Sequence, residues 1–202
     1  MVRRFFLTAL LCLAVSPAIA QPAPPPASPA PVRVSLDTSA GTIVLELDAA
    51  HAPVTTANFL HYVDQKRYDG AVFYRAMKMT DTGLIQGGIR DPRKLLPPIA
   101  HEPTTQTGIK HETGAISMAR GAPGTATSDF FILTGPMPGL DAHPEQAGDN
   151  LGFAAFGHVV EGMDVVRSIL TAPTSSTKGE GVMKGQMLEP EVRIVAARRI
   201  GG

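Results

Sequence analysis

Residues 114–134 read GAISMARGAPGTATSDFFILT, which predicts a strand, a glycine-rich loop and a second strand. Ile116 and Met118 alternate with small or polar residues, as expected for a strand that is buried on one face. Residues 121–127 show no apolar periodicity and contain two glycines, which is typical of a loop. The run FFIL at 130–133 is short, apolar and rich in β-forming residues. We expect this stretch to form one wall of a shallow apolar groove.

The rest of the chain predicts a mainly β fold. Alternating or short apolar runs indicate further strands at 32–36, 42–47, 71–75, 84–89, 153–160 and 192–196. Helices are predicted at 53–63 and 163–170, and loops at 90–113, 141–150 and 171–187. Val54, Ala57, Leu60 and Val63 predict the buried face of the first helix. Because strands and helices do not alternate, we expect an eight-stranded antiparallel closed barrel that is capped by two α-helices.

Composition limits the classes of function. A chain of 202 residues with 44% hydrophobic content suits one globular domain, here 32–202, plus accessory segments. The formal net charge is zero and the body of the chain has no Lys/Arg cluster, which argues against nucleic-acid binding. Six histidines show no metal-ligand spacing, so we expect no metal and no other cofactor. Ser117 and Ser128 lack a nucleophile-elbow context, which argues against a hydrolase.

The N-terminal residues predict export. Arg3 and Arg4 precede an apolar run at 5–15 that is too short to span a bilayer, and Ala18-Ile19-Ala20 forms a small-residue cleavage signature. We therefore expect a signal peptide at 1–20, cleavage after Ala20, no membrane insertion afterwards, and a periplasmic or secreted protein. A retained anchor or a buried helix is the alternative. Cys12, the single cysteine, lies inside the apolar run, which argues against a lipoprotein.

Residues 21–31, QPAPPPASPAP, predict a Pro/Ala linker, because such segments favour an extended polyproline II conformation and do not pack a core. We interpret the linker as a spacer. The alternative is a ligand for a proline-recognising partner.

Five segments, taken in order, resemble the cyclophilin-type peptidyl-prolyl cis/trans isomerases. They are TTANF at 55–59, FYR at 73–75, LIQGG at 84–88, SMARGAPGTATSDFFI at 117–132 and FGHVVEGMDVV at 156–166. The resemblance extends from about residue 32 to about residue 198. It implies an eight-stranded barrel with two helices, and it implies catalysis of rotation about X-Pro bonds without a nucleophile, metal or cofactor. The implied partners are proline-containing polypeptides. No oligomer interface is evident in the sequence, so we expect a monomer.

The resemblance also implies the residues of the site. Arg75 matches the catalytic arginine, whose permanent, planar set of donors suits that role. Gln86 matches a glutamine that holds the substrate backbone and steadies the arginine. Taken alone, Arg75 could be a surface arginine that ends a strand, and Gln86 could belong to a turn.

The substrate-binding residues follow in the same way. Phe131 matches the floor of the proline pocket, although a phenylalanine in an apolar strand is also compatible with core packing. Leu140 and Phe153 match pocket walls. Ala119 and Arg120 match the edge that receives the substrate backbone.

Four positions depart from the family pattern. Ten residues separate Arg75 from Gln86, about three more than usual, and this insert near 78–82 puts Gly83 or Leu84 in place of a pocket phenylalanine. Gly139 replaces a tryptophan that helps to bind cyclosporin, so we expect weak binding of that drug. Phe153 replaces a common histidine and keeps the pocket apolar. Asp129, a further predicted substrate-binding residue, replaces a second glutamine. It could pair with Arg75 and orient it, or it could compete with the substrate, and we hypothesise orientation.

The leading hypothesis is a prolyl isomerase that acts on X-Pro bonds during the folding of exported proteins. The rival is a proline-peptide binding module or chaperone on the same fold with little turnover, because fold alone does not determine function.

Overall fold

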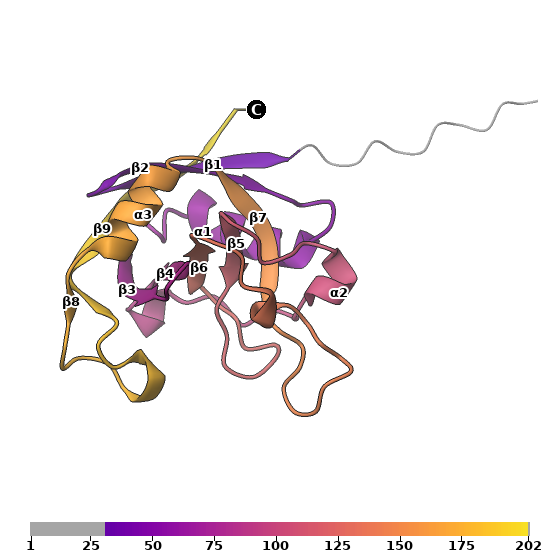
Figure 1. Cartoon of the computed structure of the whole chain (residues 1–202). Coiled ribbons are helices and arrows are strands. Elements are labelled where there is room, and N and C mark those ends of the chain that lie inside the picture. Colours follow the sequence, from indigo (N-terminus) through magenta and orange to yellow (C-terminus); the bar gives the residue numbers. More distant parts are fainter. Residues whose placement is uncertain (1–30, 202) are drawn as a thin grey trace, which may run out of the picture.

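The computed structural model describes residues 31–201, so the predicted signal peptide and all of the predicted linker except Pro31 lie outside the described residues. The described chain forms a closed antiparallel barrel, as the sequence predicts (Figure 1). Its eight strands follow the order β1-β2-β7-β5-β6-β4-β3-β9, and β9 pairs with β1 to close the ring. The bounds are β1 Val32–Thr38, β2 Gly41–Leu47, β3 Val72–Lys78, β4 Gly83–Gly88, β5 Ala115–Met118, β6 Phe130–Leu133, β7 Ala154–Glu161 and β9 Met187–Ile200. A two-residue strand, β8 Thr174–Ser175, is attached to β9.

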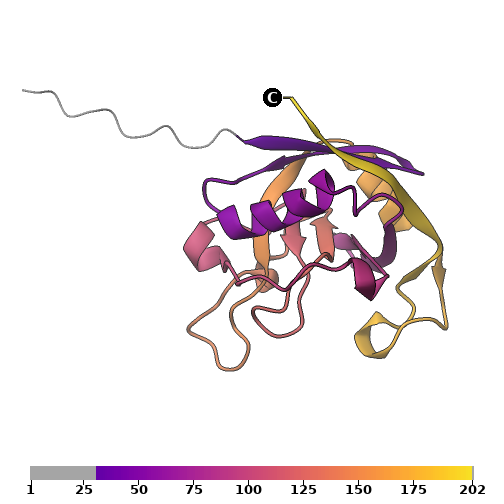
Figure 2. The same cartoon turned by 180° about the vertical axis from the view of Figure 1, so that it is seen from behind.

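Two helices cover opposite ends of the barrel. These are α1 Pro53–Asp64 and α3 Met163–Thr171, both predicted. Helix α3 lies toward the viewer in Figure 1, whereas α1 crosses the front of the molecule in Figure 2, which is seen from behind. Among residues 31–201, no helix has both the length and the apolar character that crossing a bilayer requires.

Two predicted loops contain elements that the sequence analysis missed. The segment 90–113 holds the short helix α2 Thr104–Thr107 and a 3-10 turn, η1 Pro92–Lys94. The segment 171–187 holds β8, a second such turn, η3 Gly181–Met183, and the start of β9. These elements are too short to produce a periodic apolar pattern. A further 3-10 turn, η2 Pro138–Leu140, precedes the predicted loop at 141–150.

The predicted buried face of α1 is only partly correct. Val54 is 41% exposed and Ala57 is also exposed, whereas Thr55 and Asn58 are buried. Thr55 can be buried because its backbone amide and its hydroxyl both donate to the carboxylate of Glu102, at 2.8 and 2.7 Å. A buried polar group that is hydrogen-bonded in this way avoids most of its desolvation cost. Tertiary partners, which a helical pattern does not reveal, therefore rotate the helix relative to the prediction.

Strand β6 connects the barrel core to the groove. Phe130 points into the barrel and packs edge-on against Phe59, Tyr68 and Phe73, with ring centroids 5.4–5.6 Å apart. Because side chains alternate along a strand, the next residue, Phe131, belongs to a separate apolar cluster on the other side of the sheet. The continuous apolar run FFIL thus reflects burial on both faces of β6.

Candidate active site

The apolar half of the site is a cluster of side chains outside the barrel. Phe131 and Leu84 are nearly fully buried, and the ring of Phe153 packs edge-on against Phe131 with centroids 5.5 Å apart. The full cluster comprises Leu84, Ala115, Phe131 and Leu133, with the partly buried Met77, Ala119, Met137, Leu140 and Phe153 packed against them. The five apolar residues predicted to bind substrate, which are Leu84, Ala119, Phe131, Leu140 and Phe153, therefore lie together in this cluster.

Met77 forms a wall that the sequence analysis missed. It pairs directly with Leu84 across β3 and β4. The insert lengthens this hairpin, so a methionine and a leucine occupy the region where the family pattern has a phenylalanine. Met77 follows Arg75 by two residues, and strand periodicity alone would have placed both on one face.

The two predicted catalytic residues are brought together by the β3–β4 hairpin. Arg75 and Gln86 are cross-strand partners, and Arg75 Nη1 donates to Gln86 Oε1 at 2.9 Å. The pairing register shifts between Phe73 and Arg75, so β3 carries a β-bulge at Tyr74. Because a bulge places two residues opposite one, the side chains of Tyr74 and Arg75 both reach Gln86.

Gln186 is a second partner of Arg75 that the sequence analysis missed. Arg75 Nε donates to Gln186 Oε1 at 2.8 Å, and the Gln186 amide donates in turn to the backbone carbonyl of Val182 at 2.8 Å. Gln186 lies in the segment predicted as a loop, where no motif marks it. Burial lowers the pKa of Arg75, although a guanidinium remains charged in proteins. Among residues 31–201, the one hydrogen-bond acceptor near the third nitrogen, Nη2, is the Sδ atom of Met77, at 3.6 Å.

The predicted pairing of Asp129 with Arg75 is wrong. Asp129 Oδ2 accepts a hydrogen bond of 2.6 Å from the hydroxyl of Tyr74, and no hydrogen bond or ion pair joins Asp129 to Arg75 in the described chain. The bulge explains the difference, because it places Tyr74 between the two groups. Burial raises the pKa of the Asp129 carboxyl, and the hydrogen bond from Tyr74 acts in the opposite direction.

The side chain of Arg120 supports the pocket wall. Its guanidinium pairs with Asp149 at 2.7 Å, donates to the carbonyl of Gly152 at 2.9 Å, and lies 5.2 Å from the centre of the Phe153 ring. The backbone amide of Ala119 is bonded to the Asp129 carbonyl at 2.8 Å. Within residues 31–201, the amide and carbonyl of Arg120 make no backbone hydrogen bond, so they remain available to a bound peptide.

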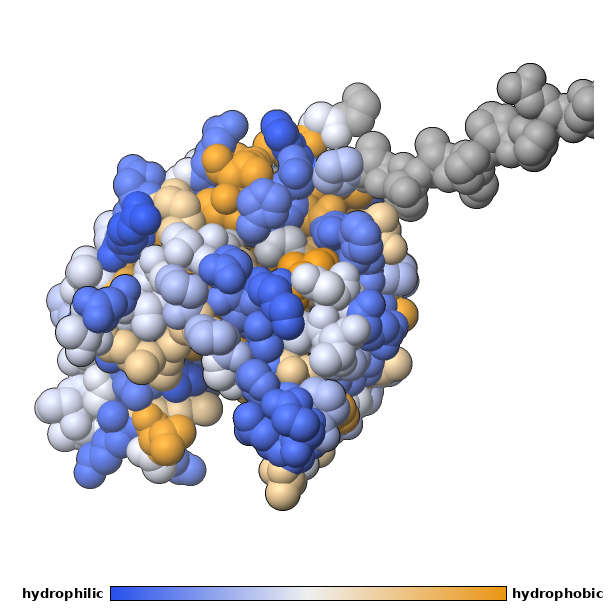
Figure 3. Space-filling model, turned by 45° about the vertical axis from the view of Figure 1, so that its right-hand side comes forward, coloured by the Kyte–Doolittle hydropathy of each residue, from blue (hydrophilic) through white to orange (hydrophobic). Residues whose placement is uncertain are grey.

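A cavity of about 420 Å³ adjoins the catalytic pair. Tyr74, Gln86 and Asp129 line it, together with Met183 and Met187 from the segment around the start of β9. The space-filling view shows the molecule hollowed at its lower edge between two lobes (Figure 3). An apolar group of side chains marks the left-hand lobe, where Figure 1 places the segment between β8 and β9.

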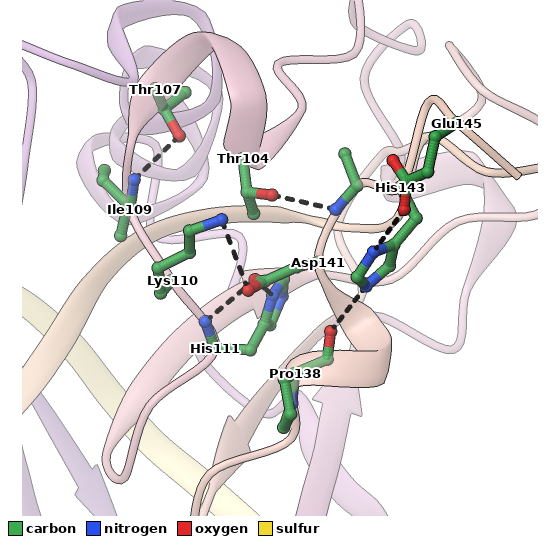
Figure 4. A network of polar contacts seen from close by, with 10 residues as sticks. Thr104, Thr107, Ile109, Lys110, His111, Pro138, Asp141, His143 and Glu145 are labelled. Carbon is green, nitrogen blue, oxygen red and sulfur yellow. Dashed lines mark hydrogen bonds and ion pairs between the residues drawn. The ribbon is translucent and has the colours of Figure 1, made fainter.

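A buried polar chain supports Phe131 from beneath. The ring of His111 stacks on Phe131, with centroids 6.0 Å apart and an interplanar angle of 17°. His111 Nδ1 lies 2.8 Å from Asp141 Oδ1, and its Nε2 lies 2.9 Å from the hydroxyl of Ser117. Since the carboxylate accepts, the bonding pattern assigns the proton to Nδ1 and makes Ser117 the donor to Nε2. Figure 4 shows Asp141 facing His111 and Lys110.

This arrangement resembles a Ser-His-Asp triad in connectivity but not in function. Ser117 is 0% exposed and lies beneath the pocket floor, so no substrate can reach its hydroxyl. Burial lowers the pKa of His111, while the hydrogen bond to Asp141 acts in the opposite direction. The hydrogen-bonded series of Ser117, His111 and Asp141 supports the ring of Phe131. Within residues 31–201, no group of three or more His, Cys, Asp or Glu side chains is placed to bind a metal ion.

Comparison with known proteins identifies the family. A model of the cyclophilin type peptidyl-prolyl cis-trans isomerase family matches residues 33–198. The chain belongs to this family. It is 40% identical over 151 residues to the peptidyl-prolyl cis-trans isomerase cyp18 of Streptomyces antibioticus, covering 72% of this chain and 87% of that protein. It is 35% identical over 173 residues to peptidyl-prolyl cis-trans isomerase A of Dickeya dadantii, covering 84% of each.

Solved structures agree with the barrel. The crystal structure of a cyclophilin type peptidyl-prolyl cis-trans isomerase from Cryptosporidium parvum superposes with a TM-score of 0.67 at 21% identity, covering 85% of this chain and 99% of that one. A structure of the same protein in the presence of the dipeptide Ala-Pro gives a TM-score of 0.66 at 22% identity, covering 84% and 99%. At these identities the likeness concerns the fold. The relatives compared by sequence are named as isomerases, and this cyclophilin is an enzyme of that class.

Proposed function

We propose that this cyclophilin accelerates rotation about X-Pro peptide bonds in exported proteins and that Arg75 and Gln86 are its catalytic residues. One observation carries the assignment of the site. The direct hydrogen bond between Arg75 and Gln86 places a fixed cation beside the apolar cluster around Phe131. A proline ring needs an apolar pocket, and the rotating amide needs a donor nearby, so the two halves of the site match the two halves of the substrate.

The chemistry follows from the amide bond. Its partial double-bond character gives a rotational barrier of about 18–20 kcal/mol. In the twisted transition state resonance is lost, and the proline nitrogen gains lone-pair density. A preorganised donor that interacts more strongly with this state than with the planar amide lowers the barrier, and each ~1.4 kcal/mol of such difference is tenfold in rate.

Arg75 is held so that one end of its guanidinium faces the substrate. Nε and Nη1 are bonded to Gln186 and Gln86. Within the described residues, Nη2 is bonded to a thioether sulfur alone, which is a weak acceptor, so its protons are available to a substrate. Phe131 holds the proline ring while the free backbone groups of Arg120 hold the peptide chain.

The rival function, a proline-peptide binding module with little turnover, shares the apolar pocket. The bonded Arg75–Gln86 pair favours the enzyme, because binding alone does not require a cation that is fixed beside the reacting bond.

A protease-coupled isomerisation assay of the wild type and Arg75→Ala tests the proposal. The wild type accelerates the cis-to-trans exchange of an Ala-Pro peptide, and loss of the donor lowers the rate by about 10²-fold or more. Equal activity of the two proteins, or inactivity of both, would refute the assignment. Arg167→Ala, on the exposed surface of α3, is a matched control that removes an arginine elsewhere.

Export rests on the N-terminal sequence, and the proposed location is the periplasm or the medium. The mature chain then begins at Gln21, acts as a monomer on proline-containing polypeptides, and carries the Pro/Ala linker as a spacer. N-terminal sequencing of the protein recovered from the extracytoplasmic fraction tests this. A chain that retains residues 1–20, or that stays in the cytosol, would contradict export.

Weak cyclosporin binding is part of the same proposal. Gly139 is exposed, and a Cβ added there would meet no atom within 4 Å, so this position offers the drug no side chain. We expect inhibition of the wild type only above micromolar concentrations. Gly139→Trp should bind the drug more tightly, whereas sub-micromolar inhibition of the wild type would refute the argument.

A further inference from the structure

Four side chains beside the cavity form a continuous hydrogen-bonded chain. Arg75 Nη1 donates to Gln86 Oε1 at 2.9 Å, Gln86 Nε2 donates to the hydroxyl of Tyr74 at 2.7 Å, and that hydroxyl donates to Asp129 Oδ2 at 2.6 Å. The chain joins β3 and β4 to the residue that precedes β6. Tyr74 and Gln86 are only 4% and 7% exposed, so water does not readily replace these bonds.

Arg75 and Asp129, at the two ends of this series of hydrogen bonds, determine the direction of every bond between them. Arg75 can only donate, and an ionised Asp129 can only accept. The single proton of the Tyr74 hydroxyl must therefore point to Asp129, which leaves the hydroxyl oxygen to accept from Gln86. The amide of Gln86 then has its NH₂ group toward Tyr74 and its carbonyl toward Arg75. If the amide were reversed, its NH₂ group would face the Arg75 donor and its oxygen would face the Tyr74 oxygen, so both bonds would be lost.

Packing holds the members of the chain in place. The guanidinium of Arg90 lies 4.4 Å from the centre of the Tyr74 ring. The hydroxyl of Ser128 lies 3.3 Å from Asp129 Oδ1. A Cβ added at Gly88 would collide with the Asp129 carboxylate, so this glycine provides the space that the carboxylate occupies.

We propose that Asp129 is a positioning residue that acts through the Tyr74 hydroxyl to fix the orientation of the Gln86 amide and thereby the position of Arg75. The inference rests on the proposed catalytic role of Arg75 and Gln86. A glutamine in place of Asp129, as in the common family pattern, both donates and accepts and would not impose one direction. The Asp129 carboxylate therefore fixes the direction of the hydrogen bonds that lead to Arg75.

The proposal predicts a particular pH dependence of turnover. Protonated Asp129 can donate to Tyr74, so acidification removes the acceptor that fixes the direction of the Tyr74 hydroxyl and leaves the Gln86 amide constrained from the Arg75 end alone. Burial raises the pKa of Asp129, which brings this change closer to neutral pH. The other charged or titratable groups near Asp129 are Tyr74 from β3, Tyr62 from α1, Tyr68 from the turn that follows α1, and Arg90 after β4. Arg120 and Glu180 line the same cavity, and Arg75 is connected to Asp129 through Gln86 and Tyr74.

The test compares the wild type with Tyr74→Phe, Asp129→Asn and the double variant. We expect Tyr74→Phe to lower kcat about tenfold with KM changed less than twofold, and Asp129→Asn to lower kcat several-fold. The double variant should resemble Tyr74→Phe alone, because both substitutions break one chain. Between pH 8 and pH 4.5, kcat of the wild type should fall with acidity, and this fall should be absent from both single variants.

Stability separates positioning from a structural role. Because burial raises the pKa of Asp129, its charge disfavours the folded state at neutral pH, and Asp129→Asn should unfold no more readily than the wild type. Tyr62→Phe is the matched control. It removes another buried hydroxyl, bonded to the Leu96 amide at 2.8 Å, and should lower stability without changing kcat.

The outcomes are distinguishable. If Arg75→Ala is inactive while Tyr74→Phe and Asp129→Asn retain kcat within twofold of the wild type, the positioning role is wrong. It is also wrong if the pH dependence persists in both variants. If Arg75→Ala is as active as the wild type, the proposed catalytic site itself fails.

Discussion

The two sides of the groove each contain a carboxylate beside an aromatic ring, Asp141 buried and Asp129 half-buried, and the two carboxylates have different surroundings. Asp141 accepts from the ring and the backbone amide of His111, at 2.8 and 3.1 Å, and Lys110 lies 3.5 Å away. Asp129 receives one short bond from Tyr74 and one long contact from Ser128, at 2.6 and 3.3 Å. Asp141 is well satisfied and supports the floor of the pocket. Asp129 has fewer hydrogen-bond partners and is connected to the catalytic pair through Tyr74.

The difference shows how stability and activity are divided within one site. His111, Asp141 and Ser117, which support Phe131, form a connected hydrogen-bond network, and loss of this network should lower the free energy of unfolding. The series of hydrogen bonds that ends at Asp129 contains a carboxylate whose pKa burial raises, so its charge should lower stability while it fixes the direction of those bonds. Active sites commonly retain such unfavourable groups because the function requires them.

Phe131→Ala should have the largest effect on stability. The ring is 3% exposed and contacts His111 and Phe153, so its removal leaves a cavity and should lower the free energy of unfolding by about 3 kcal/mol. KM for an Ala-Pro peptide should also rise. Denaturant unfolding and steady-state kinetics measure the two effects. A loss of stability below about 1 kcal/mol would show that Phe131 is not a core residue.

Asp141→Asn and Asp129→Asn form a direct contrast. In Asp141→Asn the amide oxygen can still accept one hydrogen bond, but the charge-assisted bonds from His111 are lost. The free energy of unfolding should therefore fall by about 1–3 kcal/mol. Asp129→Asn should show no such loss. Denaturant unfolding of the two variants measures the contrast. Equal destabilisation by the two substitutions would remove the distinction between the two sides of the groove.

The pH dependence of stability should report on His111. Its folded-state pKa is lowered by burial, so the unfolded state binds the proton more readily. The corresponding stability is fully present above the unfolded pKa of about 6.5 and is lost as the pH falls toward the folded value. His111→Gln should abolish this part of the dependence. The difference between the two proteins is the relevant quantity, because the pKa of His143 is raised and acts in the opposite direction.

Gln186→Ala should have the smallest effect. Arg75 would lose the acceptor of its Nε proton but keep the bond to Gln86, so we expect kcat to fall about threefold to tenfold, equivalent to roughly 1 kcal/mol. Gln106→Ala, at an exposed position of α2, is the matched control. If both variants have the kcat of the wild type, the segment between β8 and β9 does not hold the arginine.

Much of this architecture was predictable because it is local. Alternation and turn residues predicted the strands, and the resemblance predicted that Arg75, Gln86 and Phe131 share a site. The face that α1 buries was not predictable, because Glu102, which accepts the hydrogen bonds of Thr55, comes from a distant segment of the sequence. The bulge at Tyr74 was equally hidden, since no residue of FYR indicates that two consecutive side chains would face Gln86. Gln186 depends on long-range pairing of β3 with β9, which a single sequence does not reveal.

The most direct test of the division between the two sides separates kcat from KM in two conservative variants. Arg75→Lys keeps the charge but loses the planar fork of donors, and should lower kcat at least tenfold with little change in KM, a loss of about 1.4 kcal/mol or more. Phe131→Leu keeps an apolar floor with a different shape, and should raise KM several-fold with a smaller change in kcat. If both variants alter the same parameter to the same extent, the groove does not separate binding from catalysis.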